Sequence, residues 1–115
     1  MPFSRGDIIE VNLSMPPEGR VMNHPAIIIS NDEVFLDDEC YIVVMMTSTL
    51  QNDKYSFVIE DYMLTQANNK PHSEARCHLI TYVLESHIVQ GRPKNKLRNQ
   101  YVDDLINHIN NCALF

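Results

Sequence analysis

YIVVMMTST, residues 41–49, is a continuous apolar run that ends in three hydroxyl side chains. Its β-branched and aromatic residues fit a pleated, buried surface, so we predict a buried strand over residues 41–46. Thr47, Ser48 and Thr49 then lie at the strand's end, where their hydroxyl groups can bind a phosphate or a ribose 2′-hydroxyl. The alternative is that these hydroxyl groups only stabilise a turn.

Further strand patterns lie on both sides of this run. We predict four of them, at residues 7–13, 26–30, 55–59 and 75–82. The first alternates between apolar and polar side chains, as a half-buried strand does. Prolines and a glycine in residues 14–23 favour turns, so this segment is predicted to be a surface loop. Residues 51–53 are a candidate hairpin turn between the strands at 41–46 and 55–59.

The pattern changes to a helical period after Gly91 and Pro93. An apolar stripe recurs every three or four residues, and its members are Leu97, Tyr101, Val102, Leu105, Ile106 and Ile109. We therefore predict a C-terminal amphipathic helix, with Asn95 as its N-cap. Short strands followed by one helix indicate a mainly β fold with α, in which the helix packs on a small barrel of about five to seven strands.

The size and composition of the chain suit a single domain. It has 115 residues, of which 44% are hydrophobic, so we expect one domain spanning residues 1–115. No run approaches the roughly 18 to 20 apolar residues that a membrane span needs. Arg5 and Asp7 lie where a signal peptide would be apolar. We therefore expect a cytoplasmic protein without a membrane partner.

The formal net charge of −6 limits how the chain can bind nucleic acid. Affinity for phosphate groups comes mainly from Lys and Arg, so a negative total opposes long-range attraction. Acidic residues crowd positions 32–39, and the one basic cluster consists of Arg92, Lys94, Lys96 and Arg98. That cluster is also typical of a solvated helix start. Any RNA site must therefore be local.

The cysteines and most histidines suggest no metal site and no cofactor. The three cysteines, Cys40, Cys77 and Cys112, are odd in number, widely separated and without CxxC or Cys/His ligand spacing. Free, mostly buried thiols are the simplest interpretation, and neither a disulfide framework nor a zinc site is expected. No partner spacing suggests a metal ligand among His72, His87 and His108.

Arg76 and His78 are the most useful pair for phosphate chemistry. They are two residues apart in a predicted strand, so their side chains should leave the sheet on the same side. Arginine offers a permanent charge and a planar fork that fits phosphate oxygens, while histidine can give or take a proton near neutral pH. The alternative is a surface ion pair of Arg76 with Glu74 or Glu85, and a His78 that only hydrogen-bonds within the barrel.

His24 is a second histidine that can face the same cleft. It precedes Pro25, and the restriction before proline holds it extended at the end of the predicted loop. No Gly-rich phosphate loop, GxSxG elbow or HExxH helix is present in the sequence.

Four segments together resemble the MazF/PemK family of toxins, which includes the Kid branch and CcdB-like relatives. They are RGDIIEV (5–11), NHPAIIISND (23–32), YIVVMMTST (41–49) and SEARCH (73–78), in the family's order. The C-terminal amphipathic helix is similar to the family's closing element. The resemblance implies an SH3-like barrel and a homodimeric, metal-independent endoribonuclease of a type II toxin–antitoxin system. Such an enzyme cuts single-stranded RNA at a short sequence, leaves a 2′,3′-cyclic phosphate, needs no cofactor and is blocked by a cognate antitoxin.

The resemblance also assigns roles to individual residues. Arg76 matches the catalytic arginine of the Kid branch, and His78 stands where that branch has an aspartate. Thr47 and Ser48 match the Thr-Ser pair that lines the site. The candidate catalytic residues are therefore Arg76, His78, His24 and Thr47, and the candidate RNA-binding residues are Ser48, Arg20, Asn23 and Thr49.

Two positions depart from the family pattern. His24 occupies the place of the arginine in the family's RP dipeptide, and Met45 replaces a proline. The first change loses a charged phosphate ligand. His24 can instead serve as a general base, and Arg20 in the preceding loop can supply the missing charge.

Three hypotheses follow from the sequence. The first is an active endoribonuclease toxin. The second is a catalytically impaired barrel of the same descent that binds RNA or protein as a regulatory module, which the loss of the arginine and the negative charge favour. The third is a small β-barrel unrelated to toxins. A short overlapping upstream gene for a DNA-binding protein with an acidic tail would favour the first.

Overall fold

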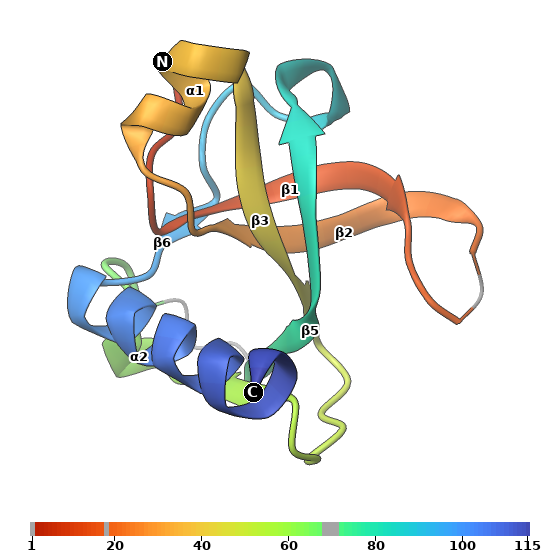
Figure 1. Ribbon diagram of the computed structural model, residues 1–115, viewed down its shortest axis with the longest axis vertical. Coiled ribbons are helices and arrows are strands. Elements are labelled where there is room, and N and C mark those ends of the chain that lie inside the picture. The colour runs from red at the N-terminus through yellow and green to blue at the C-terminus, as the bar shows by residue number, and fades with distance from the viewer. Residues whose placement is uncertain (1, 18, 68–71) are drawn as a thin grey trace.

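The computed structural model describes residues 2–17, 19–67 and 72–115 (Figure 1). Within these residues the chain forms one six-stranded antiparallel sheet and two α-helices. The strands are β1 (Asp7–Ser14), β2 (Val21–Ile28), β3 (Cys40–Thr47), β4 (Ser56–Ile59), β5 (Ser73–Leu84) and β6 (Asn95–Lys96). The helices are α1 (Asp32–Asp38) and α2 (Asn99–Ile109), and α2 continues as a π-helical turn, Asn110–Leu114. This confirms the predicted mainly β fold with a C-terminal helix.

The sheet closes on itself as a small barrel. Its strand order is β4-β5-β3-β2-β1-β6, and the segments that follow the two end strands meet. Leu64, beyond β4, forms an antiparallel bridge with Leu97, beyond β6. The backbone N–H of Thr65 also donates to the carbonyl of Lys96 at 2.9 Å. The backbone groups at the two edges are therefore partly satisfied by each other, as closure of a barrel requires.

Two hydrophobic cores lie on the two faces of the strands. In β1, Ile8 contributes to the core under α2, and the next residue, Ile9, contributes to the other core. In β2, Ile27 likewise contributes to the core under α2, and Ile28 contributes to the other core. Strands that are covered on both faces need continuous apolar sequence, because side chains alternate between the faces. This explains the uninterrupted run at residues 41–46.

Strand β5 has a bulge in its pairing with β3, where the register between the two strands shifts. Val44 of β3 pairs with Ile80, but Met46, two residues on, pairs with Ala75. Four residues of β5, 76–79, therefore stand opposite a single residue of β3. Such a bulge bends a strand and redirects its side chains. The segment that bends contains both Arg76 and His78.

The predicted hairpin turn at residues 51–53 is wrong. Strand β4 pairs with β5 and makes no pair with β3, because the long strand β5 occupies the place beside β3. Residues 41–46 and 55–59 both lie in strands, as predicted. Local spacing alone does not show that β5, from later in the chain, lies between these two strands.

The predicted N-cap of the C-terminal helix is also wrong. Asn95 lies in β6 and pairs with Ile8, and the N-cap of α2 is Arg98. Leu97 belongs to the apolar stripe, but its backbone is extended because it bridges to Leu64. No helix in the described part of the chain is long and apolar enough to cross a membrane.

Helix α1 was not predicted. Asn31 caps it, since its side-chain oxygen accepts a hydrogen bond from the Val34 N–H at 3.3 Å. Asp32 and Glu33 lie in its first turn, where acidic side chains are favourable to the helix dipole. Glu39 ends the helix in a left-handed conformation, at φ 54°. The acidic run at 32–39 is therefore a capped helix.

Candidate functional site

The predicted site residues line two adjoining pockets, which we call the composite cleft. The first pocket lies where the loop after β1, strand β2 and the end of β3 meet, and has a volume of about 460 Å³. Six candidates line it: Arg20, Asn23, His24, Thr47, Ser48 and Thr49. The second pocket, of about 360 Å³, contains Arg76 and His78 from the bend of β5, together with Thr47 and Gln51. Thr47 and the loop residues Met15, Pro16 and Pro17 belong to both pockets, so the structure brings all eight candidates together.

The hydroxyl group of Thr47 stands between the two pockets. Its Oγ1 accepts a hydrogen bond from the Thr49 N–H at 3.2 Å, so the alternative that these hydroxyls form a turn is also correct. A hydroxyl group has one proton and two lone pairs. Accepting this bond leaves the Thr47 proton available for a ligand in the cleft.

Arg76 is almost completely buried, with 8% of its surface exposed, and two carboxyl groups surround its guanidinium. Nη1 donates to Asp53 Oδ1 at 3.0 Å and Nη2 donates to Asp53 Oδ2 at 2.9 Å, which is a bidentate pair. Nη1 also donates to Glu74 Oε1 at 2.9 Å and to Ser56 Oγ at 3.1 Å. The alternative of an ion pair with Glu74 is correct, but the pair is buried and not on the surface as expected. Asp53 is a partner that sequence reasoning missed.

These ion pairs shift the protonation equilibria of both partners. Hydrogen bonds from Arg76 hold the pKa of the Asp53 carboxyl well below its usual range. The hydrogen bond to Asp53 raises the pKa of Arg76 above its ordinary value. A guanidinium has five N–H donors, and these contacts use only Nη1 and Nη2. Arg76 can therefore meet a phosphate either through its remaining donors or by exchanging Asp53, whose side chain is 44% exposed.

Glu74 is the buried partner of the Arg76 guanidinium. Its side chain is fully buried, and Oε1 accepts from Arg76 and from the Gln51 N–H, the latter at 3.0 Å. Its Oε2 has no hydrogen-bond partner in the described part of the chain. Burying a carboxyl group is costly unless it is paired. Glu74 and Arg76 therefore depend on each other.

His78 is exposed at the mouth of the second pocket. Its ring lies against the Tyr55 ring, with centroids 4.1 Å apart and an interplanar angle of 31°. Partial desolvation of the ring, and then the nearby charge of Arg76, lower the pKa of His78. The imidazole is thus mainly neutral near pH 7, the form that can accept a proton.

His24 lines the first pocket of the composite cleft, whereas His78 lines the second. His24 is half-buried in β2 opposite Val11 of β1. Only the last part of β2, from Ala26 to Ile28, pairs with β3, so the strand edge at His24 borders the pocket instead of another strand. Pro25 fits this position because a strand edge without a partner needs no donor. Arg20, whose Nε donates to Met22 Sδ at 3.2 Å, lines the same pocket as His24.

A comparison with known families identifies the family of the chain. The family described as PemK-like, MazF-like toxins of type II toxin–antitoxin systems matches residues 4–112. The chain belongs to this family. No curated protein matches the sequence closely enough to be reported.

Solved structures share the fold of this MazF-like chain at low sequence identity. A MazF from Deinococcus radiodurans superposes with a TM-score of 0.73 at 7% identity, covering 96% of each chain. An endoribonuclease from a mycobacterial species, solved with its cognate antitoxin, gives a TM-score of 0.71 at 11% identity, covering 96% of this chain and 93% of that one. A MazE–MazF complex from Deinococcus radiodurans gives 0.70 at 8% identity, covering 96% and 95%. At these identities the likeness establishes the fold.

Sequence reasoning missed several residues around the site of this MazF-like chain. Asp53 and Tyr55 come from the segment before β4, and each contacts a β5 candidate. Nothing in their local spacing pointed to β5, because the contact depends on β4 pairing with β5. Glu74 was named from the sequence as a possible partner of Arg76, since it stands two residues before Arg76 on the same strand.

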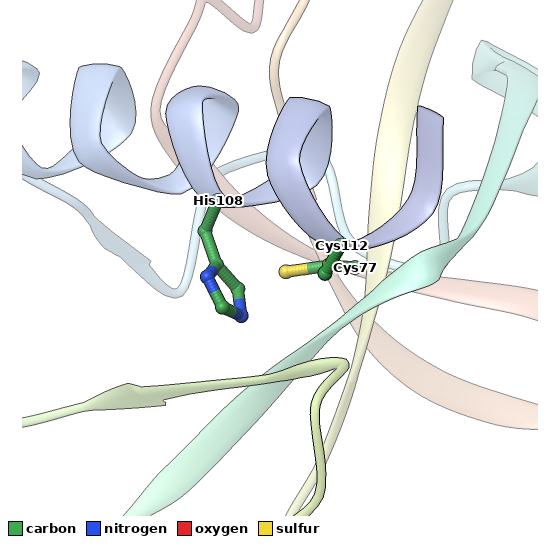
Figure 2. Close-up of side chains that lie close together, drawn as sticks. All are labelled: Cys77, His108 and Cys112. Atoms are coloured by element: carbon green, nitrogen blue, oxygen red, sulfur yellow. The ribbon is translucent and has the colours of Figure 1, made fainter. Parts of the chain in front are cut away.

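The structure also brings together three side chains of the types that bind metals, although the spacing of the cysteines in the sequence gave no sign of such a group. Cys77, His108 and Cys112 place their donor atoms within 4.8 Å of one another (Figure 2). The available sequence signal was the four-residue spacing of His108 and Cys112, which puts both on one face of a helix. Burial, and then the neighbouring Cys112, raise the pKa of the Cys77 thiol to about 12. Without a metal, this thiol stays protonated near neutral pH.

Proposed function

We propose that this MazF-like chain is a sequence-selective, metal-independent endoribonuclease toxin that cuts single-stranded RNA in the cytoplasm. The observation that carries the proposal is the composite cleft, in which two arginines, two histidines and three hydroxyl side chains line adjoining pockets. These are the groups that a phosphodiester cleavage without a metal requires. The name of the mycobacterial endoribonuclease, which shares this fold, supports the same activity.

The proposed reaction is an internal transfer at phosphorus. A histidine accepts the proton of the ribose 2′-hydroxyl, and that oxygen forms a bond to the adjacent phosphorus. The bond from phosphorus to the 5′-oxygen breaks, and this oxygen takes a proton from an acid. The products are a 2′,3′-cyclic phosphate and a 5′-hydroxyl. No metal takes part in these steps.

The residues divide the work by their chemistry and position. Arg76 offers charge and N–H donors to the phosphate oxygens, where negative charge grows in the transition state. The two candidates for the base and the acid are His78 and His24. His78 is mainly neutral and is exposed beside Arg76, and His24 lines the adjoining pocket. Thr47 and Ser48 hydrogen-bond the phosphate or the 2′-hydroxyl.

The remaining polar residues of the first pocket hold the RNA strand. Asn23 and Thr49 supply hydrogen bonds, and Arg20 supplies the positive charge that the family has at the position of His24. Arg20→Ala should then lower the cleavage rate of a single-stranded RNA. Unchanged cleavage by this variant would reject the compensating role of Arg20.

Two partners follow from the same proposal. We expect a cognate antitoxin, since the mycobacterial endoribonuclease was solved with its own, and we propose that it covers the composite cleft. We also expect a homodimer. Light scattering of the purified chain tests this expectation, and a mass equal to that of one chain over the micromolar range would contradict it.

Cleavage assays on matched variants test the catalytic proposal. Arg76→Lys keeps a positive charge beside the buried Glu74, so it preserves the fold better than Arg76→Ala, but it loses the planar fork. His78→Ala changes an exposed ring. We expect each to lower the cleavage rate by about 100-fold or more. Arg5→Ala and His87→Ala, which change an arginine and a histidine outside the cleft, should cleave like the wild type.

A second function is favoured by specific observations. Two carboxyl groups compensate the charge of Arg76, and a histidine replaces the family's other arginine. Both features suit a catalytically impaired barrel that binds RNA or protein as a regulatory module. Binding of RNA without any cleavage, by a wild-type protein with intact folding, would favour this alternative.

A further inference from the structure

The Cys77–His108–Cys112 cluster lies on the other side of β5 from the composite cleft. Figure 2 shows His108 and Cys112 projecting from the C-terminal helix toward the strand that carries Cys77. The sulfur atoms and a ring nitrogen all lie within 4.8 Å of one another. Cys77 is fully buried, while His108 and Cys112 are half-buried. The cluster therefore has a buried inner end and a side open to solvent.

The local structure explains why these side chains meet. Residues four apart on a helix lie on one face, so His108 at the end of α2 and Cys112 in the following π-helical turn point in the same direction. Successive side chains of a strand point to opposite faces, so Cys77 points to the core beneath α2 while its neighbours Arg76 and His78 line the cleft. The Nε2 atom of His108 lies 3.1 Å from the Lys54 carbonyl oxygen, which orients the ring.

Two cysteines and one histidine form a donor set that zinc prefers. Zinc binds thiolate sulfur at about 2.3 Å and imidazole nitrogen at about 2.0 to 2.1 Å, in a tetrahedron. In such a tetrahedron two sulfurs are about 3.8 Å apart, so donors that already lie within 4.8 Å need to approach by no more than about 1 Å. Two thiolates also balance the double charge of the ion, which suits a site with one buried wall.

We propose that Cys77, His108 and Cys112 form a zinc site whose fourth position is taken by water from the open side. Binding forms two zinc–sulfur bonds and one zinc–nitrogen bond, and the two thiol protons pass to solvent. The site ties the end of the C-terminal helix to the bend of β5. It takes no part in RNA cleavage, because its donors face the core and the cleft lies on the other face of the strand.

Two other fates of the same residues compete with the zinc site. The thiols can simply pack in the core, since Cys77 and Cys112 both contact the apolar cluster under α2. They can also form a disulfide bond with each other. A disulfide needs only the two sulfurs, whereas the histidine ring, held at the same point by the Lys54 carbonyl, completes a ligand set. This third donor is the reason to favour a metal.

Metal titration of the purified, fully reduced full-length chain tests the proposal. We would first remove metal with a chelator, then titrate Zn²⁺ by calorimetry, and separately add Co²⁺ to look for the charge-transfer absorption of thiolate-bound cobalt. The expected result is one ion per chain, a thiolate–cobalt band and a higher Tm with zinc. Cys112→Ser and His108→Ala, which change half-buried side chains, should each weaken zinc binding by about 100-fold or more, beyond the roughly 10- to 100-fold cost of losing an outer partner.

Matched controls separate this site from surface binding. Cys40→Ser and His87→Ala change a cysteine and a histidine outside the cluster and should bind zinc like the wild type. The proposal is wrong if the reduced protein binds no zinc, or if all the variants bind it equally. If zinc does not bind and air oxidation links Cys77 to Cys112, the disulfide is the correct alternative to the zinc site. Mass spectrometry of the peptides would detect this bond. RNA cleavage is measured separately in EDTA, so failure of one proposal is distinct from failure of the other.

Discussion

At the scale of single residues, two carboxylates compensate the charge of Arg76, and this governs how a phosphate would bind the guanidinium in the proposed mechanism. The guanidinium that we propose for the phosphate is already bound by Asp53 and Glu74. Glu74 is buried and cannot leave, but the Asp53 side chain is 44% exposed and can turn toward solvent. An incoming phosphate therefore competes with Asp53 for the fork of Arg76, since both offer paired oxygens.

Replacing Asp53 tests this competition. Asp53→Asn removes the competing negative charge, so a single-stranded RNA should bind several-fold more tightly. Fluorescence anisotropy with a labelled RNA measures the change, and Asp103→Asn, which alters the exposed ion pair with Arg5, is the control. Weaker RNA binding by Asp53→Asn would mean that Asp53 positions the arginine and does not compete with the RNA.

The same ion pair predicts how stability depends on pH. The pKa of Asp53 is lowered in the folded chain, whereas an unfolded aspartate titrates near about 3.9. Below that pH the unfolded chain binds a proton that the folded chain does not, so this contribution to stability is present above about pH 4 and is lost as the pH falls further. Urea denaturation between about pH 5 and pH 2.5 should show a steeper loss of stability for the wild type than for Asp53→Asn. Parallel curves would contradict the role of this pair.

The sequence predicted which residues line the cleft better than it predicted which residues they contact. Arg76, His78 and Thr47 were chosen from strand spacing and resemblance, and all three line one pocket. Asp53 was missed because it reaches Arg76 only through the pairing of β4 with β5. The Cys77–His108–Cys112 cluster was missed because Cys77 is far from the other two residues in the chain. Long-range contacts of this kind have no local sequence signal.

At the scale of elements, hydrophobic periodicity predicted the strands β1 to β5 and the C-terminal helix, but it missed β6 and placed residues 21–23, which begin β2, in a loop. Periodicity works here because each element buries apolar side chains at its own repeat. It did not determine the order of the strands, so the hairpin between β3 and β4 was wrong. It also placed the helix start too early, because Leu97 fits the helical stripe while its backbone belongs to the closing bridge. Helix α1 contributes no fully buried residue, so it gave no apolar stripe to recognise.

Helix α2 should contribute to stability through its buried stripe. Leu105 is fully buried in the core between the sheet and the helix. Leu105→Ala leaves a cavity there and should lower the free energy of unfolding by about 2 to 5 kcal/mol. Urea denaturation measures the free energy of unfolding. The control is Asp104→Ala, at the exposed residue next to Leu105, which should change this free energy by less than about 0.5 kcal/mol. Equal effects of both substitutions would show that α2 does not pack as described.

At the scale of the whole molecule, the proposed function requires an acidic chain to bind an acidic polymer. The net charge is −6, and the composite cleft contains two arginines, Arg20 and Arg76. Attraction over long distances is therefore weak, and binding depends on contacts made inside the cleft. This suits an enzyme that recognises a short single-stranded sequence and not the general charge of RNA.

The salt dependence of RNA binding should reflect this small number of contacts. Each phosphate neutralised on a single strand contributes about −0.7 to the slope of log K against log salt, so two arginines predict a slope of about −1.4. Anisotropy titrations from low to moderate salt measure the slope. A slope steeper than about −4 would mean that basic residues outside the composite cleft, such as those of the segment 92–98, bind the RNA as well.

The chemistry of the cut ends tests the central claim most directly. A long single-stranded RNA is incubated with the purified wild-type chain in EDTA, and the fragment ends are mapped. The proposed mechanism predicts cuts at a few sequence-defined sites, each with a 2′,3′-cyclic phosphate on one fragment and a 5′-hydroxyl on the other. Cleavage that requires an added metal ion, or that leaves a 5′-phosphate, would contradict it.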